Sequence, residues 1–385
     1  MKQFYCSIAI VFLLTFGTKS NALSFKESNI RVEKEDSISY SKEDVQEAYR
    51  AFNEYIYDPD RKLYYRDSDR PEAVAAIWTQ AVYWDMAMNA YKLDPTVENR
   101  QRIEDIYQGN YDHYKAYDWY GFPDVWFIYD DIMWWVISMA RAYELTGESK
   151  YLEHAVSGFT RVWYGIPELD VGSYDKEKGG MFWAWTKGRS GKMACINYPT
   201  VIAATLLYNI TENKNYLDKA KDVYSWSRNN LFDQETGEVA DSKHGDGEPN
   251  WKPHTYNQGT CIGAAVGLYK ITEDEGYLSD AILAADFTRD SMSSSSQLLH
   301  FDKGEEQGIY HAIFGQYIAQ LAKDCDRPEY LDWIRKNISI GWKNRDKARR
   351  LTVRDFSKKV SAKETISAYD ASGIVGLMLV SASEK

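Results

Sequence analysis

The chain has 385 residues, a formal net charge of -11 and a high aromatic content, including 30 Tyr and 13 Trp. This length is enough to bury a large core, and by itself it would allow two or three domains. The densest basic run, 343–354, is short and mixed in charge, so we expect no nucleic-acid partner and a neutral substrate instead.

The N-terminus has the features of a cleavable secretory signal. Lys2 precedes an apolar run over 8–16, and the small residues of 20–22 form a cleavage site. The apolar run is too short for a permanent membrane span, and Cys6 precedes it, so we see no lipid-attachment site. We therefore expect a secreted or periplasmic protein. The expected organisation is a signal peptide over 1–22, a polar lead-in over 23–40 and a single domain over 41–385.

Three cysteines remain after removal of this signal, Cys195, Cys261 and Cys325. An odd number allows at most one disulfide, and we expect buried free thiols. The three cysteines form no C-x-x-C pair and have no histidine near them in the sequence, so a structural zinc site is disfavoured. The six histidines form no recognisable motif. We expect neither a metal nor a cofactor.

Hydrophobic spacing, capping residues and Pro or Gly stops predict about twelve helices. The first begins at a capping box, Ser41 to Asp44, and ends before Pro59; the second ends at Pro95. No run of alternating residues between the helices indicates a strand. The predicted ranges are 42–56, 71–93, 97–109, 130–146, 148–163, 195–212, 213–230, 256–272, 274–292, 306–324, 327–341 and 366–382.

A sequence template recurs along the chain. A Tyr-x-x-Thr segment followed by Tyr-Leu-x-x-Ala begins at Tyr143, Tyr208 and Tyr269, at spacings of 65 and 61 residues, and Tyr330 begins a weaker copy. Such spacing is typical of a repeated helical hairpin. Six hairpins closed into a double ring make an all-α fold, the (α/α)6 barrel. An open superhelical array is the alternative, although its repeats are usually shorter.

The connections between helices are of two kinds. Turns within each template are tight, whereas the other connections are long and lead into the N-terminus of the following helix. All long loops therefore meet at one end of the ring, where we expect the functional residues. The long connections are 110–129, 164–194, 231–255, 293–305 and 342–365.

Two adjacent carboxylates, Asp130 and Asp131, begin a helix at this loop-rich end. On a helix they diverge by about 100°, with β-carbons roughly 5 to 6 Å apart, so both can reach one cavity without a hydrogen bond between them. Helix capping is the alternative, since Asp is favoured in a first turn. The aromatic residues around the pair favour a catalytic role. They are Tyr114, Tyr117, Trp119, Tyr120, Phe122, Trp126, Phe127, Tyr129, Trp134 and Trp135.

Two further segments begin helices at the same end. One runs over 179–185 and contains Trp183 and Trp185; the other runs over 251–259 and begins a helix at Tyr256. Aromatic rings and amides together suit a polyhydroxylated ligand. A turn at 179–180 and a polar helix start at 256–259 are the structural alternatives.

These motifs together resemble glycoside hydrolase family 76, the family of endo-α-1,6-mannanases and related fungal cell-wall proteins. The resemblance covers about 40–382. It is carried by Tyr129-Asp130-Asp131 with Trp134-Trp135, the segment Arg141 to Gly147, Trp78-x-Gln80, Trp183-Ala184-Trp185, Asn197 and Tyr256-Asn257-Gln258-Gly259. It implies an (α/α)6 barrel that hydrolyses internal α-1,6-mannosidic bonds with retention of configuration.

The resemblance also implies roles for individual residues. Asp130 matches the nucleophile, Asp131 the acid/base, and Asp241 a carboxylate that holds the sugar. Ser242 and Ile132 depart from the Gly and Asn that are common in the family. The expected substrate-binding residues are Asp241, Trp78, Gln80, Trp134, Trp183, Trp185, Asn197, Tyr256, Asn257 and Gln258. We expect a monomer that acts on α-1,6-mannan.

The chemistry agrees with the resemblance. Retaining glycosidases use two carboxyl groups roughly 5 to 5.5 Å apart. Two such acids repel when both are ionised, so one pKa rises and supplies the proton. The alternatives are a transglycosylase or a non-catalytic glycan-binding protein of the same fold, or another (α/α)6 glycan hydrolase of the unsaturated-glucuronyl type.

Overall fold

The computed structural model describes residues 40–186, 191–301, 303, 304 and 306–382. The predicted signal peptide and nearly all of the lead-in lie outside these residues. Within them the chain forms twelve α-helices. They are α1 (Lys42–Ile56), α2 (Ile77–Leu93), α3 (Val97–His113), α4 (Tyr129–Thr146), α5 (Ser149–Tyr164), α6 (Ala194–Thr211), α7 (Lys214–Asn230), α8 (Thr255–Thr272), α9 (Glu275–Asp286), α10 (Tyr310–Asp324), α11 (Pro328–Asn344) and α12 (Ala368–Ser381).

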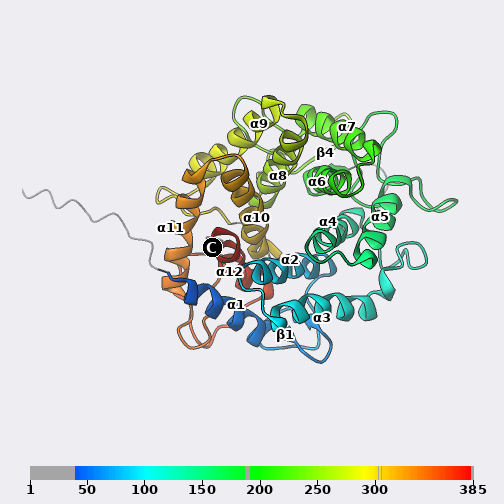
Figure 1. The fold of residues 1–385 in the computed structure, drawn as a ribbon. Coiled ribbons are helices and arrows are strands. Elements are labelled where there is room, and N and C mark those ends of the chain that lie inside the picture. Colours follow the sequence, from blue (N-terminus) through cyan, green and yellow to red (C-terminus); the bar gives the residue numbers. More distant parts are fainter. Residues whose placement is uncertain (1–39, 187–190, 302, 305, 383–385) are drawn as a thin grey trace, which may run out of the picture. The chain divides into compact units, whose positions relative to one another are not determined.

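The helices form two concentric rings (Figure 1). In the inner ring, α2, α4, α6, α8, α10 and α12 each contact the next, and α12 contacts α2. The outer helices α3, α5, α7, α9 and α11 each pack on the preceding inner helix, and α1 packs on α12. At this seam the Tyr40 hydroxyl lies 3.3 Å from the Ser381 hydroxyl. The closed (α/α)6 barrel is confirmed, and the open array is excluded.

The inner helices are buried on almost every face, as their sequences require. In α12 every residue except Asp370 is buried, and in α8 the buried run extends unbroken from Thr255 to Val266. Close approach between neighbours depends on small residues: a β-carbon on Gly263 would lie 2.2 Å from the Tyr317 ring. Burial of apolar surface between neighbouring inner helices, at roughly 25 cal/mol per Å², therefore stabilises the inner ring.

The recurring template forms the tight turns. In each copy the residue after the threonine has a left-handed conformation, and its N–H donates to the template tyrosine carbonyl at 2.7 to 2.8 Å. The threonine hydroxyl donates back to the helix at 2.6 to 2.8 Å. Gly147 takes this conformation easily, whereas Glu212 and Glu273 adopt it at a cost of about 1 kcal/mol. The predicted hairpin turn is confirmed.

The connections between helices contain two small antiparallel sheets that the sequence did not predict. Strands β1 (Tyr57–Asp58) and β2 (Leu63–Tyr64) pair with each other, and β3 (Gly191–Met193) pairs with β4 (Ser242–His244). The β3–β4 sheet joins the loop before α6 to the loop before α8. An isolated antiparallel bridge also pairs Ile128, directly before α4, with Ala184 in the loop before α6. Loops from different hairpins are thus tied together at one end of the ring.

The two largest differences between predicted and observed helix boundaries are at the start of α2 and at the end of α9. The helix expected from residue 71 begins at Ile77, because Val74 is bridged to Tyr65 and the Ala75 N–H donates to the Tyr64 carbonyl at 2.9 Å. The last six residues of the helix expected over 274–292 form a π-helical turn. Sequence periodicity could not detect the later start of α2, because it depends on backbone pairing with another segment.

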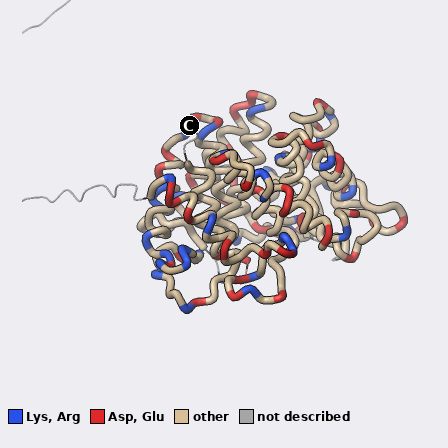
Figure 2. Tube along the Cα trace, turned by 60° about the horizontal axis from the view of Figure 1, so that its bottom comes forward, with Lys and Arg blue, Asp and Glu red and all other residues tan. Residues whose placement is uncertain are grey.

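Acidic and basic residues are interspersed over the described part (Figure 2). Arg100 pairs with Glu148, and Lys150 pairs with Glu104 at 2.7 Å, joining α3 to α5. Within the described residues, Cys195, Cys261 and Cys325 are free, as predicted; Cys195 and Cys261 are buried, whereas Cys325 is only half-buried. No helix described by the structure is long and apolar enough to cross a membrane.

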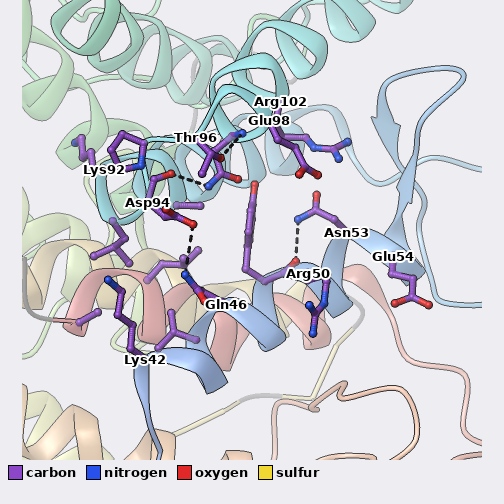
Figure 3. Close-up of a pocket in the computed structure, with 18 of the residues that line it drawn as sticks. Lys42, Gln46, Arg50, Asn53, Glu54, Lys92, Asp94, Thr96, Glu98 and Arg102 are labelled. Atoms are coloured by element: carbon purple, nitrogen blue, oxygen red, sulfur yellow. Dashed lines mark hydrogen bonds between the residues drawn. The ribbon is translucent and has the colours of Figure 1, made fainter.

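A cavity of 1440 Å³ lies between α1, the α2–α3 turn and the end of α12. Figure 3 shows Gln46 of α1 reaching Asp94 on the other wall, where its amide donates to the carboxylate at 3.4 Å. The cavity is lined by the last residues of α2, the end opposite to the long loops. None of the predicted site residues lines it. Cavity size therefore does not locate the candidate site, and the placement of the carboxylates does.

Candidate active site

The carboxylate pair occupies the first turn of α4, in a site closed over by another loop. The cap residue is Ile128, which makes no side-chain cap, so neither Asp130 nor Asp131 caps the helix. The Tyr129 N–H donates to the Trp183 carbonyl at 2.9 Å, and Ile128 is bridged to Ala184. The loop before α6 thus covers the start of α4. Neither carboxylate is therefore the N-cap, although both lie in the first turn of α4.

Asp130 is buried and hydrogen-bonded by its surroundings. The Trp183 indole donates to its Oδ2 at 3.2 Å, and the Cys195 thiol also donates to its carboxylate. Burial raises the pKa of Asp130 to about 6, against the opposing effect of these bonds and of one from Asp131. The negative charge of Glu306 adds to the increase. A carboxyl with this pKa is ionised in neutral solution.

Asp131 has the more strongly shifted carboxyl. Burial, then the charge of Asp130, raise its pKa well above the ordinary value, and Glu306 acts in the same direction. Protonated Asp131 donates a hydrogen bond to Asp130. The expectation that the two carboxyls would not bond to each other is therefore corrected. The environment separates the pair into one anion and one proton donor.

Tryptophan and tyrosine rings surround the pair. Trp134, one helical turn after Asp130, packs against Trp78 with ring centroids 5.8 Å apart. The Trp78 indole donates to Glu306 Oε2 at 3.1 Å. Trp183 and Trp185 are partly exposed. Partly exposed indoles beside carboxylates are suited to stack on the apolar face of a sugar.

A second wall comes from α8 and α10. The Tyr256 ring stacks on the partly exposed Tyr310 with centroids 3.9 Å apart. Asp241 lies close enough to Tyr256 and Cys195 to raise the pKa of both groups. Its carboxylate accepts from the Ser242 hydroxyl at 3.1 Å. The structure thus brings Asp241 and Tyr256 to the same site as Asp130, through Cys195.

Three predicted substrate-binding amides have a different role. Gln80, Asn197 and Gln258 are fully buried and hydrogen-bond to backbone. Their contacts correct the prediction that they bind substrate: they fix the loops that carry other site residues. Gln80 binds Tyr64 N and O at 3.1 and 2.9 Å, Asn197 binds Met181 N and O at 2.8 and 3.1 Å, and Gln258 binds Val239 N and Gly237 O at 2.6 and 3.0 Å.

Asn257 differs from these amides. It is fully buried, and neither its amide nitrogen nor its oxygen has a hydrogen-bond partner in the described part of the chain. The indole nitrogen of Trp185 is likewise buried without a partner there. Unpaired buried polar atoms are uncommon and cost stability. Both residues therefore remain candidates for contacts with substrate.

A buried ion pair that the sequence did not reveal supports the start of α4. Arg161 is fully buried on α5, and its guanidinium lies 2.9 Å from Asp170. The Tyr129 hydroxyl donates to the same carboxylate at 2.6 Å. Because Tyr129 precedes Asp130 directly, this network fixes the backbone that carries the pair. The sequence offered no signal, since Asp170 lies in an irregular loop.

Within the described residues no three His, Cys, Asp or Glu side chains are grouped as metal ligands. An anionic carboxylate, a neighbouring carboxylic acid and a partly exposed aromatic lining can support general acid and nucleophilic catalysis on a neutral polyol.

Comparisons with known proteins match the chain to one family model and to many solved structures. The model of glycosyl hydrolase family 76 matches residues 40–379. No curated protein sequence matches the chain.

Three solved structures illustrate the shared fold. An inactive variant of the α-1,6-mannanase of Salegentibacter sp. HEL1_6, with two adjacent Asp replaced by Asn and α-1,6-mannotriose bound, is 23% identical with a TM-score of 0.77, covering 88% of this chain and 97% of that one. The Lin0763 protein of Listeria innocua is 22% identical with a TM-score of 0.77, covering 88% and 96%. A family 76 α-mannanase of Bacteroides thetaiotaomicron is 19% identical with a TM-score of 0.72, covering 88% and 94%.

Proposed function

The chain belongs to glycosyl hydrolase family 76, and from that premise we propose that it hydrolyses internal α-1,6-mannosidic bonds of mannan with retention of configuration. The observation that carries this proposal is the placement of two adjacent carboxyls, Asp130 and Asp131, in the first turn of α4 beside the Trp183 indole. A retaining mechanism needs two such carboxyls, one as nucleophile and one as proton donor, and the raised pKa of Asp131 supports this division. The predicted signal sequence supports action outside the cytoplasm, on a secreted or periplasmic route.

The first step forms a covalent intermediate. The Asp130 carboxylate attacks the anomeric carbon while the Asp131 carboxylic acid protonates the departing glycosidic oxygen. The shorter mannan chain leaves with a hydroxyl at its new end. In the second step Asp131, now ionised, takes a proton from water, and the resulting hydroxide displaces Asp130. Each step inverts the anomeric centre, so the product keeps the α configuration.

Other residues hold the sugar. Trp78 and Trp183 offer partly exposed indole surfaces beside the carboxyls, with the buried Trp134 packed behind Trp78, and Tyr256 and Asp241 offer a polar wall. The Salegentibacter enzyme supports this assignment, since its variant lacking two adjacent aspartates is inactive and binds α-1,6-mannotriose. We propose that the matching face of this chain binds a linear mannan segment. No cofactor takes part in this scheme.

Product analysis tests the proposal. The protein is incubated with linear α-1,6-mannan, chain lengths are followed by chromatography, and the first anomer formed is identified by ¹H NMR. Shortened chains with an initial α anomer support the proposal. Initial β anomer would contradict retention, lengthened chains would indicate transglycosylation, and unchanged chains would reduce the site to glycan binding.

The pH dependence of activity follows from the two shifted carboxyls. Turnover needs ionised Asp130 and protonated Asp131, so we expect a bell-shaped profile of kcat/KM whose acidic limb lies near 6, the pKa of Asp130. The alkaline limb lies higher and reports Asp131. Measurement of kcat/KM from about pH 4 to about pH 9 checks both limbs. A flat profile below pH 6 would contradict the assigned nucleophile.

A further inference from the structure

A third carboxylate, Glu306, faces the Asp130–Asp131 pair from the opposite side of the ring. It begins the short 3₁₀ helix η3 (Glu306–Ile309), directly before α10. We propose that Glu306 is a positioning residue of this site, which fixes the Trp78 indole and places a third negative charge beside the carboxylate pair. This inference rests on the proposed function and deepens it.

The hydrogen bond from Trp78 defines the position of Glu306. The indole nitrogen donates to Oε2 at 3.1 Å. Trp78 is partly exposed and packs on Trp134, which stands one turn after Asp130 on the same face of α4. Without an acceptor the Trp78 ring would lose the contact that sets its orientation. A charged acceptor makes that bond stronger than a neutral one.

The segment that carries Glu306 is held against α12. A β-carbon on Gly308 would lie 2.3 Å from the Asp370 carboxylate, so only glycine permits this approach. Arg354 donates to Asp370 at 2.6 Å and also to the Gly304 carbonyl. These contacts anchor the backbone on both sides of Glu306. Its carboxylate is therefore held where the fold places it.

The charge of Glu306 acts on both members of the pair. It raises the pKa of Asp130 and of Asp131, after the larger contribution of burial. The other titratable groups around the pair come from five segments. They are Tyr114 before α4, Cys195 on α6, Asp241 and His254 before α8, Tyr256 on α8, and Tyr310 on α10.

Two chemical consequences follow from this charge. A nearby anion disfavours ionisation of Asp131, so the acid stays protonated to higher pH and remains able to donate to the leaving oxygen. The same anion favours the positive charge that develops on the sugar in an oxocarbenium-like transition state. Glu306 forms no bond to the substrate in either role. Its effect reaches the reaction through Asp131 and through Trp78.

The variant Glu306→Gln separates charge from hydrogen bonding. Gln keeps an oxygen that can accept from Trp78, but it carries no charge. We expect both limbs of the kcat/KM profile to move to lower pH, the alkaline limb by about one unit, while KM for α-1,6-mannan changes less than about twofold. Glu235→Gln, an exposed glutamate in a distant turn, is the matched control and should leave the profile unchanged.

The variant Trp78→Phe tests the other half of the role. It removes the indole donor and leaves the Glu306 charge. We expect KM to rise several-fold, which corresponds to the loss of about one or two contacts with the substrate. Both limbs of the kcat/KM profile should stay at the pH values of the wild type. A role confined to folding would shift neither limb in Glu306→Gln. Unchanged limbs in that variant would therefore overturn the inference even if its stability fell.

A measurement without substrate separates this inference from the proposed function. Stability falls as pH rises through the window between the ordinary Asp pKa and the raised values, because the folded protein binds more protons there. Removing the Glu306 charge lowers those values, so Glu306→Gln should lose less Tm than the wild type between about pH 5 and pH 8. If the wild type fails to cleave mannan, the proposed function is wrong and this readout still tests Glu306. An equal loss of Tm in both proteins would contradict the proposed charge effect.

Discussion

Replacing Asp131 by Asn lowers kcat/KM on linear α-1,6-mannan by about 10³-fold or more, and Asp130→Asn lowers it at least as much. Asn keeps the shape of each side chain, but it can neither attack the anomeric carbon nor donate a carboxylic proton. Each substitution also removes a carboxyl whose ionised form is disfavoured by burial, so neither variant should lose Tm at neutral pH. Initial rates on mannan, together with thermal melts of the same preparations, check both expectations.

The two variants are distinguished by a substrate with a good leaving group. The leaving group of an aryl α-mannoside with a low leaving-group pKa does not need protonation. Asp131→Asn should therefore retain a much larger share of wild-type activity on this substrate than on mannan. Asp130→Asn, which lacks the nucleophile, should be equally impaired on both. Asp246→Asn, an exposed carboxylate paired with Lys178, is the control. More than about a tenth of wild-type mannan activity in either variant would contradict the assigned mechanism.

Replacing Arg161 by Met destabilises the protein by about 3 to 5 kcal/mol. The guanidinium is fully buried, 2.9 Å from Asp170, and its loss leaves that carboxylate without its cation. The Tyr129 hydroxyl would then be the main remaining side-chain partner of Asp170. Because Tyr129 begins α4, we also expect weaker activity. Urea unfolding at neutral pH measures the stability, and initial rates on mannan measure the activity.

Two comparisons make this result specific. Lys178→Met removes one partner of a fully solvated pair, with side chains 62% and 88% exposed, and should cost less than about 1 kcal/mol. The double variant Arg161→Met with Asp170→Asn should recover part of the loss, since no unpaired charge remains. Equal costs for Arg161→Met and Lys178→Met would show that the buried pair contributes no more than a surface pair.

The ring could be predicted because its determinants are local and repeated. The turns at Thr146, Thr211 and Thr272 use the same side-chain and backbone bonds, so one template reveals three hairpins. The short strands were missed because each has only two or three residues, too few for an alternating pattern. The start of α2 was misplaced because Val74 takes its conformation from a partner nine residues earlier.

The carboxylate pair could be predicted from its neighbours, but the rest of the site could be predicted only in part. Asparagine and glutamine suit sugar hydroxyls and backbone groups equally well, and only the structure shows that Gln80 and Gln258 bond to backbone. Glu306 gave no signal because its partner, Trp78, lies 228 residues away in the sequence. Long-range pairing of this kind cannot be derived from local patterns.

The seam between the two ends of the described ring has a consequence for engineering. Tyr40 and Ser381 are within hydrogen-bonding distance, so a short linker could join α12 to α1. A circularly permuted chain could then begin at Asn213, in a tight turn on the side of the ring away from the carboxylates. Because the inner helices contact one another in an unbroken cycle, the order in which the chain visits them is not what holds the site together.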